Sequence, residues 1–439
     1  MNNPHQTMFD ESIKQTIMHK ITHHKALLVA YSGGVDSTVL MHALVALKQQ
    51  LLPDLKLRAI YIHHGLSSNA DNWAMHCQKQ CQTWQVPLII EKVKLDPNAG
   101  NIEEQARNAR YQAIYRHLKN DETLCTAQHL DDQCETFLLA LKRGSGPAGL
   151  AAMPQENQQH FRPLLTISRA QIEAYANQHQ LNWIEDESNQ DDRYDRNFLR
   201  LKVLPILNQR WPHFSQMVAR SAELCQQQEA LINELLLVDF QQMVSQQGQL
   251  NLAPLMACSE YKRNAVLRMW LRSQQMTMPS QKQLALIWQT VVLAKEDANP
   301  KFILHCRQIR RYQNQLYLLP LYQNIEQQIL NWDLALPLIL PDNVGELQIN
   351  YRTDLSCRLP YADEQVTVRF HAQGQFQIIN RNGSRSIKKL WQEHNIPPWM
   401  RTRIPLIYYN EQLICAVGKF VTEQGKGTQI GFNLVNNGL

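Results

Sequence analysis

The chain has 439 residues, of which 44% are hydrophobic and 19% are charged, with a formal net charge of +5. This length suggests about three domains, and the apolar content suffices for ordinary packed cores, which excludes a largely disordered chain. No apolar stretch approaches the roughly 20 residues that cross a bilayer, and the N-terminus carries no signal or transit pattern. We therefore expect a folded cytoplasmic protein without a membrane partner.

The nine cysteines are odd in number and scattered along the chain. This distribution predicts reduced thiols rather than a disulfide framework. Cys77 and Cys81 form the only close pair, but their C-x-x-x-C spacing lacks a second pair or neighbouring histidines. We interpret them as two buried thiols and not as a metal site.

The excess positive charge lies at the C-terminal end of the chain. Residues 381–439 contain eight Lys or Arg against three Glu, which accounts for the whole net charge. A basic block on an otherwise neutral chain favours a polyanionic partner such as nucleic acid. The alternative interpretation is a solvated charged surface without a partner.

The stretch from Ala26 to Leu40 reads ALLVAYSGGVDSTVL, which predicts a strand, a tight turn and a helix. Glycines in the turn allow successive N–H groups to point at one anion, and the helix N-terminus adds positive potential. Neighbouring hydroxyls can donate to phosphate, and the carboxylate can orient the turn or hold a metal ion on a nucleotide. The candidate phosphate-binding residues are Ser32, Gly33, Gly34, Val35, Asp36 and Ser37. The alternative is an ordinary turn with Ser37 as the helix N-cap.

Four strand-like runs alternate with helical patterns in the first part of the chain. The runs lie at 26–31, 57–63, 87–93 and 123–127, and the helical patterns lie near 37–49, 69–85, 101–119 and 131–143. Such alternation predicts an α/β domain, with a doubly wound parallel sheet between two layers of helices. Ligands of these sheets bind beyond the carboxyl ends of the strands. The glycine turn falls there, and the backbone of 60–63 is a candidate wall for an adenine ring.

A second group of polar residues follows the fourth strand-like run. The string HLDDQCET begins at His129 and places Asp132 and Glu135 on one face of a helix. Either carboxylate alone is explained by the helix dipole, but the two together suit a cationic amine or a nucleotide-bound Mg²⁺. Arg110, on the preceding helical pattern, either belongs to a solvated salt-bridged face or reaches the crevice to neutralise phosphate charge.

Two loops of this domain are candidates for contact with a substrate backbone. Residues 144–149 match G-x-G-x-x-G, but no strand directly precedes them, so we reject a dinucleotide site. We interpret them as a flexible loop with Arg143 at its base. Residues 184–200 read as a long polar surface loop that enters a helix, with Arg196 and Arg200 near its end.

The rest of the chain divides by composition. Pro205 and Pro212 bracket an expected linker, and the long helical patterns that follow predict a small α-helical second domain. Short β-type runs from about residue 301 predict a C-terminal α+β domain. The expected domains are 1–210, 211–300 and 301–439, the last with a core at about 364–435.

The string SGGVDS resembles the signature loop of the N-type ATP pyrophosphatases, the PP-loop superfamily, which split ATP between the α and β phosphates and adenylate a substrate. Further strings make the chain similar to the tRNA(Ile)-lysidine synthetase family. These are HHGLS from His63, NIEEQARNARY from Asn101, HLDDQCET from His129, KRGSGPAGL from Lys142, DESNQD from Asp186, RNFLR from Arg196 and SIKKLWQEHNIPPWMRTRIPLIY from Ser386. Gln128 departs from the pattern, because the family often has a second histidine there.

The resemblance implies a ligase that uses ATP and Mg²⁺ to join free L-lysine to the wobble cytidine of the CAU-anticodon isoleucine tRNA, through an adenylated cytidine. It implies catalytic roles for Asp36, Arg110, Asp132 and Glu135, and lysine recognition by the last two. The residues expected to contact tRNA are Arg143, Arg196, Arg200, Arg385, Lys388, Lys389, Arg401 and Arg403.

Two other functions stay open at this point. A PP-loop tRNA thiolation enzyme shares the first domain but generally needs C-x-x-C cysteines, which are absent here. A non-catalytic RNA-binding scaffold would retain the loop without its chemistry. A homodimer is compatible with the sequence, which does not determine the oligomeric state.

Overall fold

The computed structural model describes residues 4–65, 69–94, 102–157, 159–295, 298–351 and 355–435. Leu66 and Ser67 of the HHGLS string and Asn101 of the NIEEQARNARY string lie outside the described residues. The chain forms two compact units, Met1–Leu235 and Leu236–Leu439.

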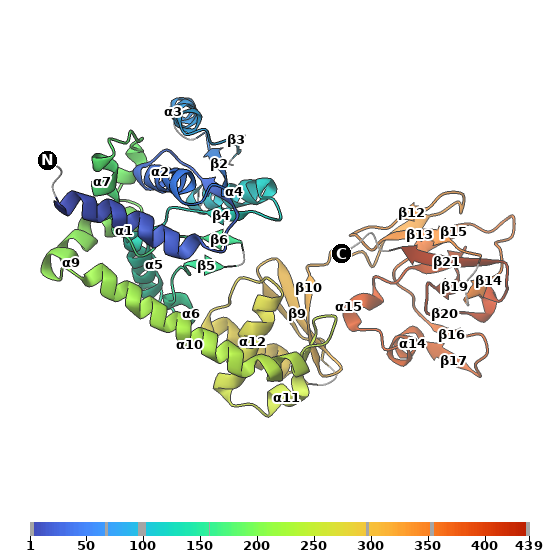
Figure 1. Cartoon of the computed structure of the whole chain (residues 1–439). Helices are drawn as coiled ribbons and strands as arrows, with labels where there is room; N and C mark the ends of the chain where they lie inside the picture. Colours follow the sequence, from blue (N-terminus) through green and yellow to red (C-terminus); the bar gives the residue numbers. More distant parts are fainter. Residues whose placement is uncertain are drawn as a thin grey trace. The chain divides into compact units, whose positions relative to one another are not determined.

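The first unit is built on a six-stranded sheet with the order β3-β2-β1-β4-β6-β5 (Figure 1). All neighbours pair in parallel except β5, which runs antiparallel to β6 at the edge. The strands are β1 (Ala26–Ala30), β2 (Lys56–His63), β3 (Leu88–Lys92), β4 (Thr123–Cys125), β5 (Glu156–Asn157) and β6 (His160–Phe161). The predicted parallel α/β sheet is confirmed, and the four predicted runs coincide with β1 to β4.

Helices cover both faces of this sheet, because successive side chains of a strand point to opposite sides. Leu27 and Val29 of β1 pack in one core with α1, α2, α3 and α7, whereas Leu28 packs on the other face against Ile114 of α4. The helices are α1 (Pro4–Ile21), α2 (Val35–Gln50), α3 (Ala70–Thr83), α4 (Ile102–His117), α5 (Leu130–Lys142), α6 (Pro147–Leu150) and α7 (Arg169–Gln178). The doubly wound arrangement is thus confirmed.

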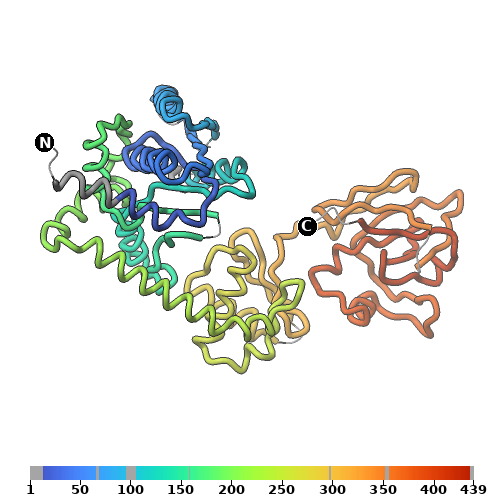
Figure 2. Tube along the Cα trace, viewed as in Figure 1, coloured from blue at the N-terminus to red at the C-terminus, as the bar shows by residue number. Residues whose placement is uncertain are grey.

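The segment after α7 is more helical than its composition suggests. It contains a 3₁₀ turn (Glu187–Gln190), α8 (Asp195–Phe198), a π-helical turn (Leu199–Val203), α9 (Leu204–Arg210) and the long helix α10 (Phe214–Met243) (Figure 2). The linker expected around Pro205 is wrong, because proline is tolerated in the first turn of a helix and here lies at the start of α9. Leu204 is buried against Cys134 of α5 and Val218 of α10.

The first part of the second unit joins helices to a small antiparallel sheet of order β7-β10-β9-β8. Its elements are β7 (Leu250–Asn251), α11 (Leu252–Met256), α12 (Glu260–Ser273), α13 (Gln281–Ile287), a π-helical turn (Trp288–Val292), β8 (Lys301–Leu304), β9 (Arg307–Tyr312) and β10 (Gln315–Pro320). Leu304, Ile309 and Leu316 of these strands share one core with Trp270 of α12. The strands after residue 300 therefore complete the core of the helical region.

The C-terminal part is dominated by antiparallel strands. Its sheets have the orders β11-β15-β18-β19-β20, β12-β13-β21-β14 and β16-β17. The elements are β11 (Ile329–Asn331), β12 (Leu338–Ile339), β13 (Glu346–Ile349), β14 (Ser356–Cys357), β15 (Val366–Arg369), β16 (Gln375–Gln377), β17 (Ser384–Ser386), α14 (Ile387–Glu393), α15 (Pro398–Arg401), β18 (Leu406–Tyr409), β19 (Gln412–Ala416), β20 (Phe420–Val421) and β21 (Ile430–Val435). Strands with two short helices fit the predicted α+β class.

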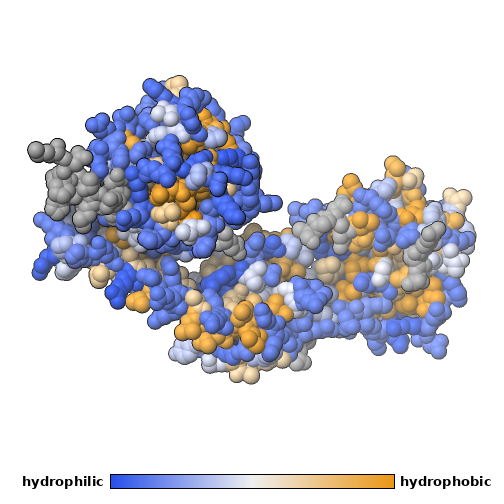
Figure 3. Space-filling view, viewed as in Figure 1, coloured by the Kyte–Doolittle hydropathy of each residue, from blue (hydrophilic) through white to orange (hydrophobic). Residues whose placement is uncertain are grey.

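The described helices, the surface and the thiols bear on the remaining sequence-based expectations. None of the described helices is long and apolar enough to cross a membrane. The face shown in Figure 3 is largely hydrophilic, with separate apolar patches. All nine cysteines are free thiols, and Cys77 and Cys81 are buried as predicted.

Candidate active site

A cavity of about 620 Å³ lies in the first unit, where β1, β2 and β4 end. Its volume falls in the range of about 300–1,000 Å³ that is typical of small-molecule sites. The glycine turn after β1, the end of β2, one face of α4, the residues after β4 and parts of 186–200 line it. The cavity therefore lies at the sheet edge where ligands of doubly wound folds bind.

The glycine turn has the geometry of an anion site. Gly33 has a φ of +80°, and a side chain there would meet Ile184 at 2.6 Å and Cys77 at 2.9 Å, so only glycine fits. Gly34 is the N-cap of α2 and no side chain caps this helix start. The interpretation of Ser37 as the N-cap is wrong, because its hydroxyl donates to the Gly34 carbonyl at 3.0 Å. The uncapped N–H groups of the first turn remain available to an anion.

The wall formed by β2 is largely apolar and ends in a histidine that follows the strand. Ile60, Tyr61 and Ile62 line the cavity, as does His64. Nδ1 of His64 is buried and has no hydrogen-bond partner among the described residues. Burial, followed by the nearby Arg110 charge, lowers the pKa of His64 to about 4, so its ring is neutral at pH 7. A flat apolar wall with a neutral polar edge suits an aromatic base.

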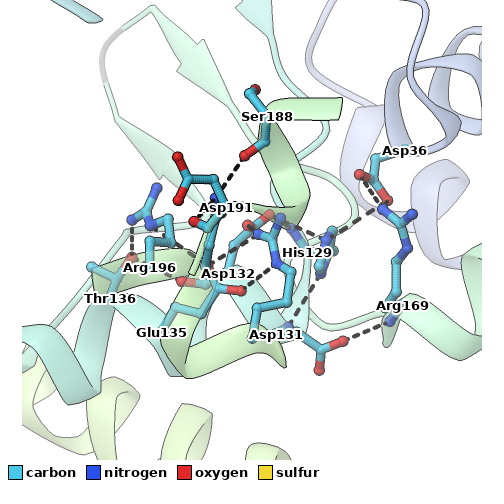
Figure 4. A network of polar contacts seen from close by, with 12 residues as sticks. Asp36, His129, Asp131, Asp132, Glu135, Thr136, Arg169, Ser188, Asp191 and Arg196 are labelled. Atoms are coloured by element: carbon cyan, nitrogen blue, oxygen red, sulfur yellow. Dashed lines mark hydrogen bonds and ion pairs between the residues drawn. The ribbon is translucent and has the colours of Figure 1, made fainter. Parts of the chain in front are cut away.

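Asp36 is held from two sides at the start of α2 (Figure 4). Nη1 of Arg169, on α7, lies 2.9 Å and 2.7 Å from its two carboxylate oxygens, and Nε2 of His129 lies 3.7 Å away. Burial raises the pKa of the Asp36 carboxyl, and His129 and Arg169 oppose that shift. Sequence reasoning missed Arg169, because no local motif connects it to the glycine turn.

Asp132 and Glu135 come together through Arg200, which lies in the π-helical turn after α8. Arg200 donates to Glu135 Oε1 at 2.7 Å and to Asp132 Oδ1 at 3.0 Å. Asp132 lines the cavity, whereas Glu135 is 0% exposed and does not line it. Burial raises the pKa of Glu135, and Arg200 opposes this shift. The carboxylate that faces a ligand is therefore Asp132, with Glu135 behind it.

Two of the arginines expected to bind tRNA instead contact the carboxylates of α5. Arg200 is paired with both carboxylates, so its charge is largely neutralised inside the protein. Arg196 donates to Thr136 Oγ1 at 3.0 Å and lies 3.5 Å from Glu135 (Figure 4). Both arginines also line the cavity. These contacts bring residues 196–200 against α5 and close one side of the cavity.

Arg110 lines the same cavity from α4. No carboxylate of the described residues pairs with it, and burial lowers its pKa. A guanidinium that faces the cavity without an anion partner among the described residues is a strong candidate for binding phosphate. Arg143 is exposed at the C-terminal end of α5 and does not line the cavity. The loop expected after it forms the short helix α6, so it is more ordered than its glycines suggested.

The C-terminal basic residues divide into exposed and internal ones. Lys388 and Lys389 are exposed on α14, and Arg385 is half-buried with its Nε 3.8 Å from Glu393. Arg401 donates to the Ile396 carbonyl at 3.1 Å. The described side chains of α14 thus present two free lysines on one short helix.

The position of Arg403 contradicts the expectation that it binds tRNA. Its guanidinium is buried, pairs with the Asp342 carboxylate, donates to the Asp342 carbonyl at 2.6 Å and stacks on Tyr322. A buried and paired arginine is not accessible to RNA. Its contacts give it a structural role in the C-terminal part of the chain.

The comparisons with known proteins cover most of the chain. Family models match a PP-loop domain at residues 5–207, a TilS substrate binding domain at 250–317 and a TilS substrate C-terminal domain at 366–433. The chain is 53% identical over 423 residues to the tRNA(Ile)-lysidine synthase of Serratia proteamaculans (strain 568), covering 95% of this chain and 97% of the relative. It is 53% identical over 418 residues to that of Proteus mirabilis (strain HI4320), covering 94% and 95%. The chain therefore belongs to the tRNA(Ile)-lysidine synthase family.

Proposed function

We propose that the protein joins free L-lysine to the wobble cytidine of the CAU-anticodon isoleucine tRNA, with ATP as the energy source. The products are lysidine, AMP and pyrophosphate, and the modified tRNA changes from methionine to isoleucine identity. The observation that carries the proposal is one cavity with an uncapped glycine turn on one side and the Asp132 carboxylate on another. Membership of the family supports the same reaction.

In the first step the cytosine O2 attacks the α-phosphorus of ATP and pyrophosphate leaves. The N–H groups at the start of α2, together with Ser32 and Ser37, would hold phosphate oxygens. Arg110 would neutralise charge that develops on the transferred group. In such transfers, fixed positive groups supply most of the catalysis.

Mg²⁺ fits the same residues. Asp36 lines the cavity in the phosphate-binding turn, and carboxylate oxygens are ligands that Mg²⁺ prefers. The described residues contain no group of three or more metal-ligating side chains. The protein would therefore provide the Asp36 carboxylate, and the ATP phosphates and water would provide the remaining ligands. The ion would neutralise phosphate charge.

In the second step the ε-amine of lysine attacks C2 of the activated cytosine. The new C–N bond forms, the C2–O2 bond breaks, and O2 leaves with AMP. Asp132 would bind the ammonium group in the ground state and accept one proton before the attack. Glu135 would act through Arg200, which it fixes in place, rather than by touching lysine.

The tRNA body requires contacts outside the cavity. We assign these to Arg143 and Arg196 of the catalytic domain, residues 1–210, and to Arg385, Lys388, Lys389 and Arg401 of the C-terminal domain. The helical domain expected at 211–300 would also bind tRNA, but its core includes the strands up to Pro320, so the boundary expected at residue 300 is wrong. Arg200 and Arg403 are not among the contacts, because both are paired internally. A homodimer in the cytoplasm is part of the proposal, and sedimentation of the purified chain tests the dimer.

The test is the mass of the tRNA product. An unmodified CAU-anticodon transcript, ATP and lysine are incubated with the protein, and AMP is measured in parallel. We expect a lysine-sized mass increase on one cytidine and one AMP per modified tRNA. A sulfur-sized change would instead indicate thiolation, and tRNA binding without AMP would indicate a non-catalytic scaffold. Either result contradicts the proposal.

A further inference from the structure

A chain of polar side chains runs from the interior of the first unit to the cavity wall. Arg162 Nη2 lies 2.8 Å from His160 Nδ1, and His160 Nε2 lies 2.7 Å from Thr126 Oγ1. The Thr126 hydroxyl donates to Gln128 Oε1. Arg162, His160 and Thr126 are all more than nine-tenths buried. Thr126 and Gln128 line the cavity, so the chain ends there.

Arg162, the first member of the chain, fixes the direction of these hydrogen bonds. A guanidinium can only donate, so Nδ1 of His160 must accept. Burial, followed by the Arg162 charge, lowers the pKa of His160 to about 3, so the ring is neutral at pH 7 and its proton is on Nε2. That N–H donates to Thr126, and the single hydroxyl proton of Thr126 is then directed at the Gln128 oxygen.

The consequence is a defined polarity at the cavity wall. Because the Gln128 oxygen already accepts from Thr126, the side-chain amide faces its ligand with N–H donors. No described residue accepts a hydrogen bond from that amide. No described carboxylate pairs with Arg162 either. Its buried positive charge favours the arrangement in which each group of the chain donates its hydrogen bond toward the cavity. A ligand at this position must therefore offer an acceptor.

The sheet order indicates which ligand this is. The phosphate-binding turn follows β1, the apolar wall that suits adenine belongs to β2, and Gln128 follows β4, on the other side of β1. With the phosphates at β1 and adenine toward β2, the β4 side is left for the second nucleobase. Asp132 lies on this side too, four residues after Gln128.

We propose that the Gln128 amide donates to N3 of the wobble cytosine and thereby distinguishes cytidine from uridine. This inference depends on the proposed function. Cytosine N3 is an acceptor, whereas uracil carries a proton on N3, which would face the amide donor with another donor. The Arg162–His160–Thr126 chain prevents the amide from rotating to present its oxygen, which would accept the uracil N3–H.

The first test is Gln128→Glu, which keeps the shape and the acceptor for Thr126 but removes the donor. We expect the KM for the CAU transcript to rise roughly five- to a hundredfold, the range expected when a buried hydrogen-bonding group loses its partner. The inhibition constant of a UAU transcript should stay the same or fall, so that the preference for cytidine collapses. The KM for ATP should not change. Circular dichroism controls for folding.

The second test separates recognition from mere structural support. Thr126→Val has nearly the same volume but frees the Gln128 amide to rotate, so it should reduce the preference for cytidine over uridine. In a Gln128→Ala background, Thr126→Val should have no further effect on this preference. A chain that only supports the fold would change stability and leave the ratio of the two transcripts unchanged in every variant.

Two results would overturn the inference. One is a folded Gln128→Glu variant that keeps the wild-type preference for cytidine, and the other is a rise in the KM for ATP in place of tRNA, which would assign Gln128 to adenine. In both cases the wild-type protein still modifies the CAU transcript. If the wild-type protein does not modify it, the proposed function has failed and not this inference alone.

Discussion

Nη1 of Arg169 lies 2.9 Å and 2.7 Å from the two carboxylate oxygens of Asp36, although the two residues are 133 positions apart in the chain. Arg169 is the first residue of α7, and its Nε also pairs with Glu173. Its backbone N–H donates to Asp131 at 3.1 Å. The ion pair thus connects the phosphate-binding turn, α5 and α7, and fixes the direction of the Asp36 carboxylate before a nucleotide binds.

This ion pair predicts different effects for its two members. Asp36→Ala should abolish AMP formation and leave the fold and tRNA binding nearly intact, because the carboxylate lies at the cavity wall. Arg169→Met should lower AMP formation only partly, because Asp36 stays present but loses its orientation. Glu173→Gln is the matched control, since it removes the other partner of Arg169. Near-normal turnover in Asp36→Ala would contradict the role given to this carboxylate.

The two carboxylates of α5 should separate in a kinetic experiment. Asp132→Asn should raise the KM for lysine roughly ten- to a hundredfold, because a charge-assisted hydrogen bond contributes about 1.5–3 kcal/mol. Adenylation without lysine should be less affected. Equal losses in both steps would instead assign Asp132 to Mg²⁺ or ATP.

Glu135→Gln should behave as a structural change, because Glu135 is fully buried against Arg200. We expect a loss of stability of about 1–3 kcal/mol in urea unfolding, together with loss of both reaction steps. The control is Asp195→Asn, which removes an exposed ion pair with Lys142 and should leave stability nearly unchanged. A variant with full stability and only a higher KM for lysine would indicate that Glu135 contacts lysine directly.

The predictions from sequence were most accurate where a function depends on residues that are close together in the sequence. Gly33 and Asp36 belong to one short motif, and the periodicity of the strands located the sheet edge where that motif lies. Arg169 and the Arg162–His160–Thr126 chain could not be predicted, because their contacts join residues that are far apart in sequence. A single arginine at the start of a helix carries no local signal of the carboxylate that it meets.

Charge alone was a weaker guide than position in the fold. Lys389 and Arg403 belong to the same basic block, yet the first is exposed and the second is buried against Asp342, 61 positions away. The proline at 205 was misleading for a similar reason. It marks a helix start rather than a linker, and only the burial of Leu204 distinguishes the two.

The exposed and buried members of this block should differ in salt dependence. Lys388→Ala with Lys389→Ala should weaken tRNA binding and reduce the slope of log affinity against log salt by about 0.7 to 0.9 for each lost phosphate contact. Thermal stability and ATP binding should not change, because both lysines are exposed. An unchanged salt slope in the double variant would remove α14 from the tRNA contacts.

Arg403→Ala should instead act through folding. It leaves the half-buried Asp342 carboxylate without its partner, and loss of one member of a fully buried ion pair costs about 3–5 kcal/mol, which is an upper limit here. Any loss of tRNA binding should therefore appear only as the C-terminal part unfolds, and the salt slope of the folded protein should match that of the wild type. A stable variant with a reduced slope would show that Arg403 contacts RNA after all.

The buried His160 predicts how stability depends on pH. Burial and the facing Arg162 and Arg107 charges lower its pKa to about 3 in the folded state, against about 6.5 in an unfolded chain. Between these values the unfolded state binds more protons, so the free energy of unfolding contributed by His160 is complete above pH 6.5 and decreases as the pH falls toward 3. The decrease is at most about 1.4 kcal/mol per pH unit for one group.

His160→Gln, measured by urea unfolding at pH 7 and pH 5, should lose less stability between the two values than the wild type does, whatever its stability at pH 7. Equal losses in the two proteins would show that His160 does not carry this pH dependence, and they would also remove the neutral ring on which the direction of the hydrogen-bond chain to Gln128 depends.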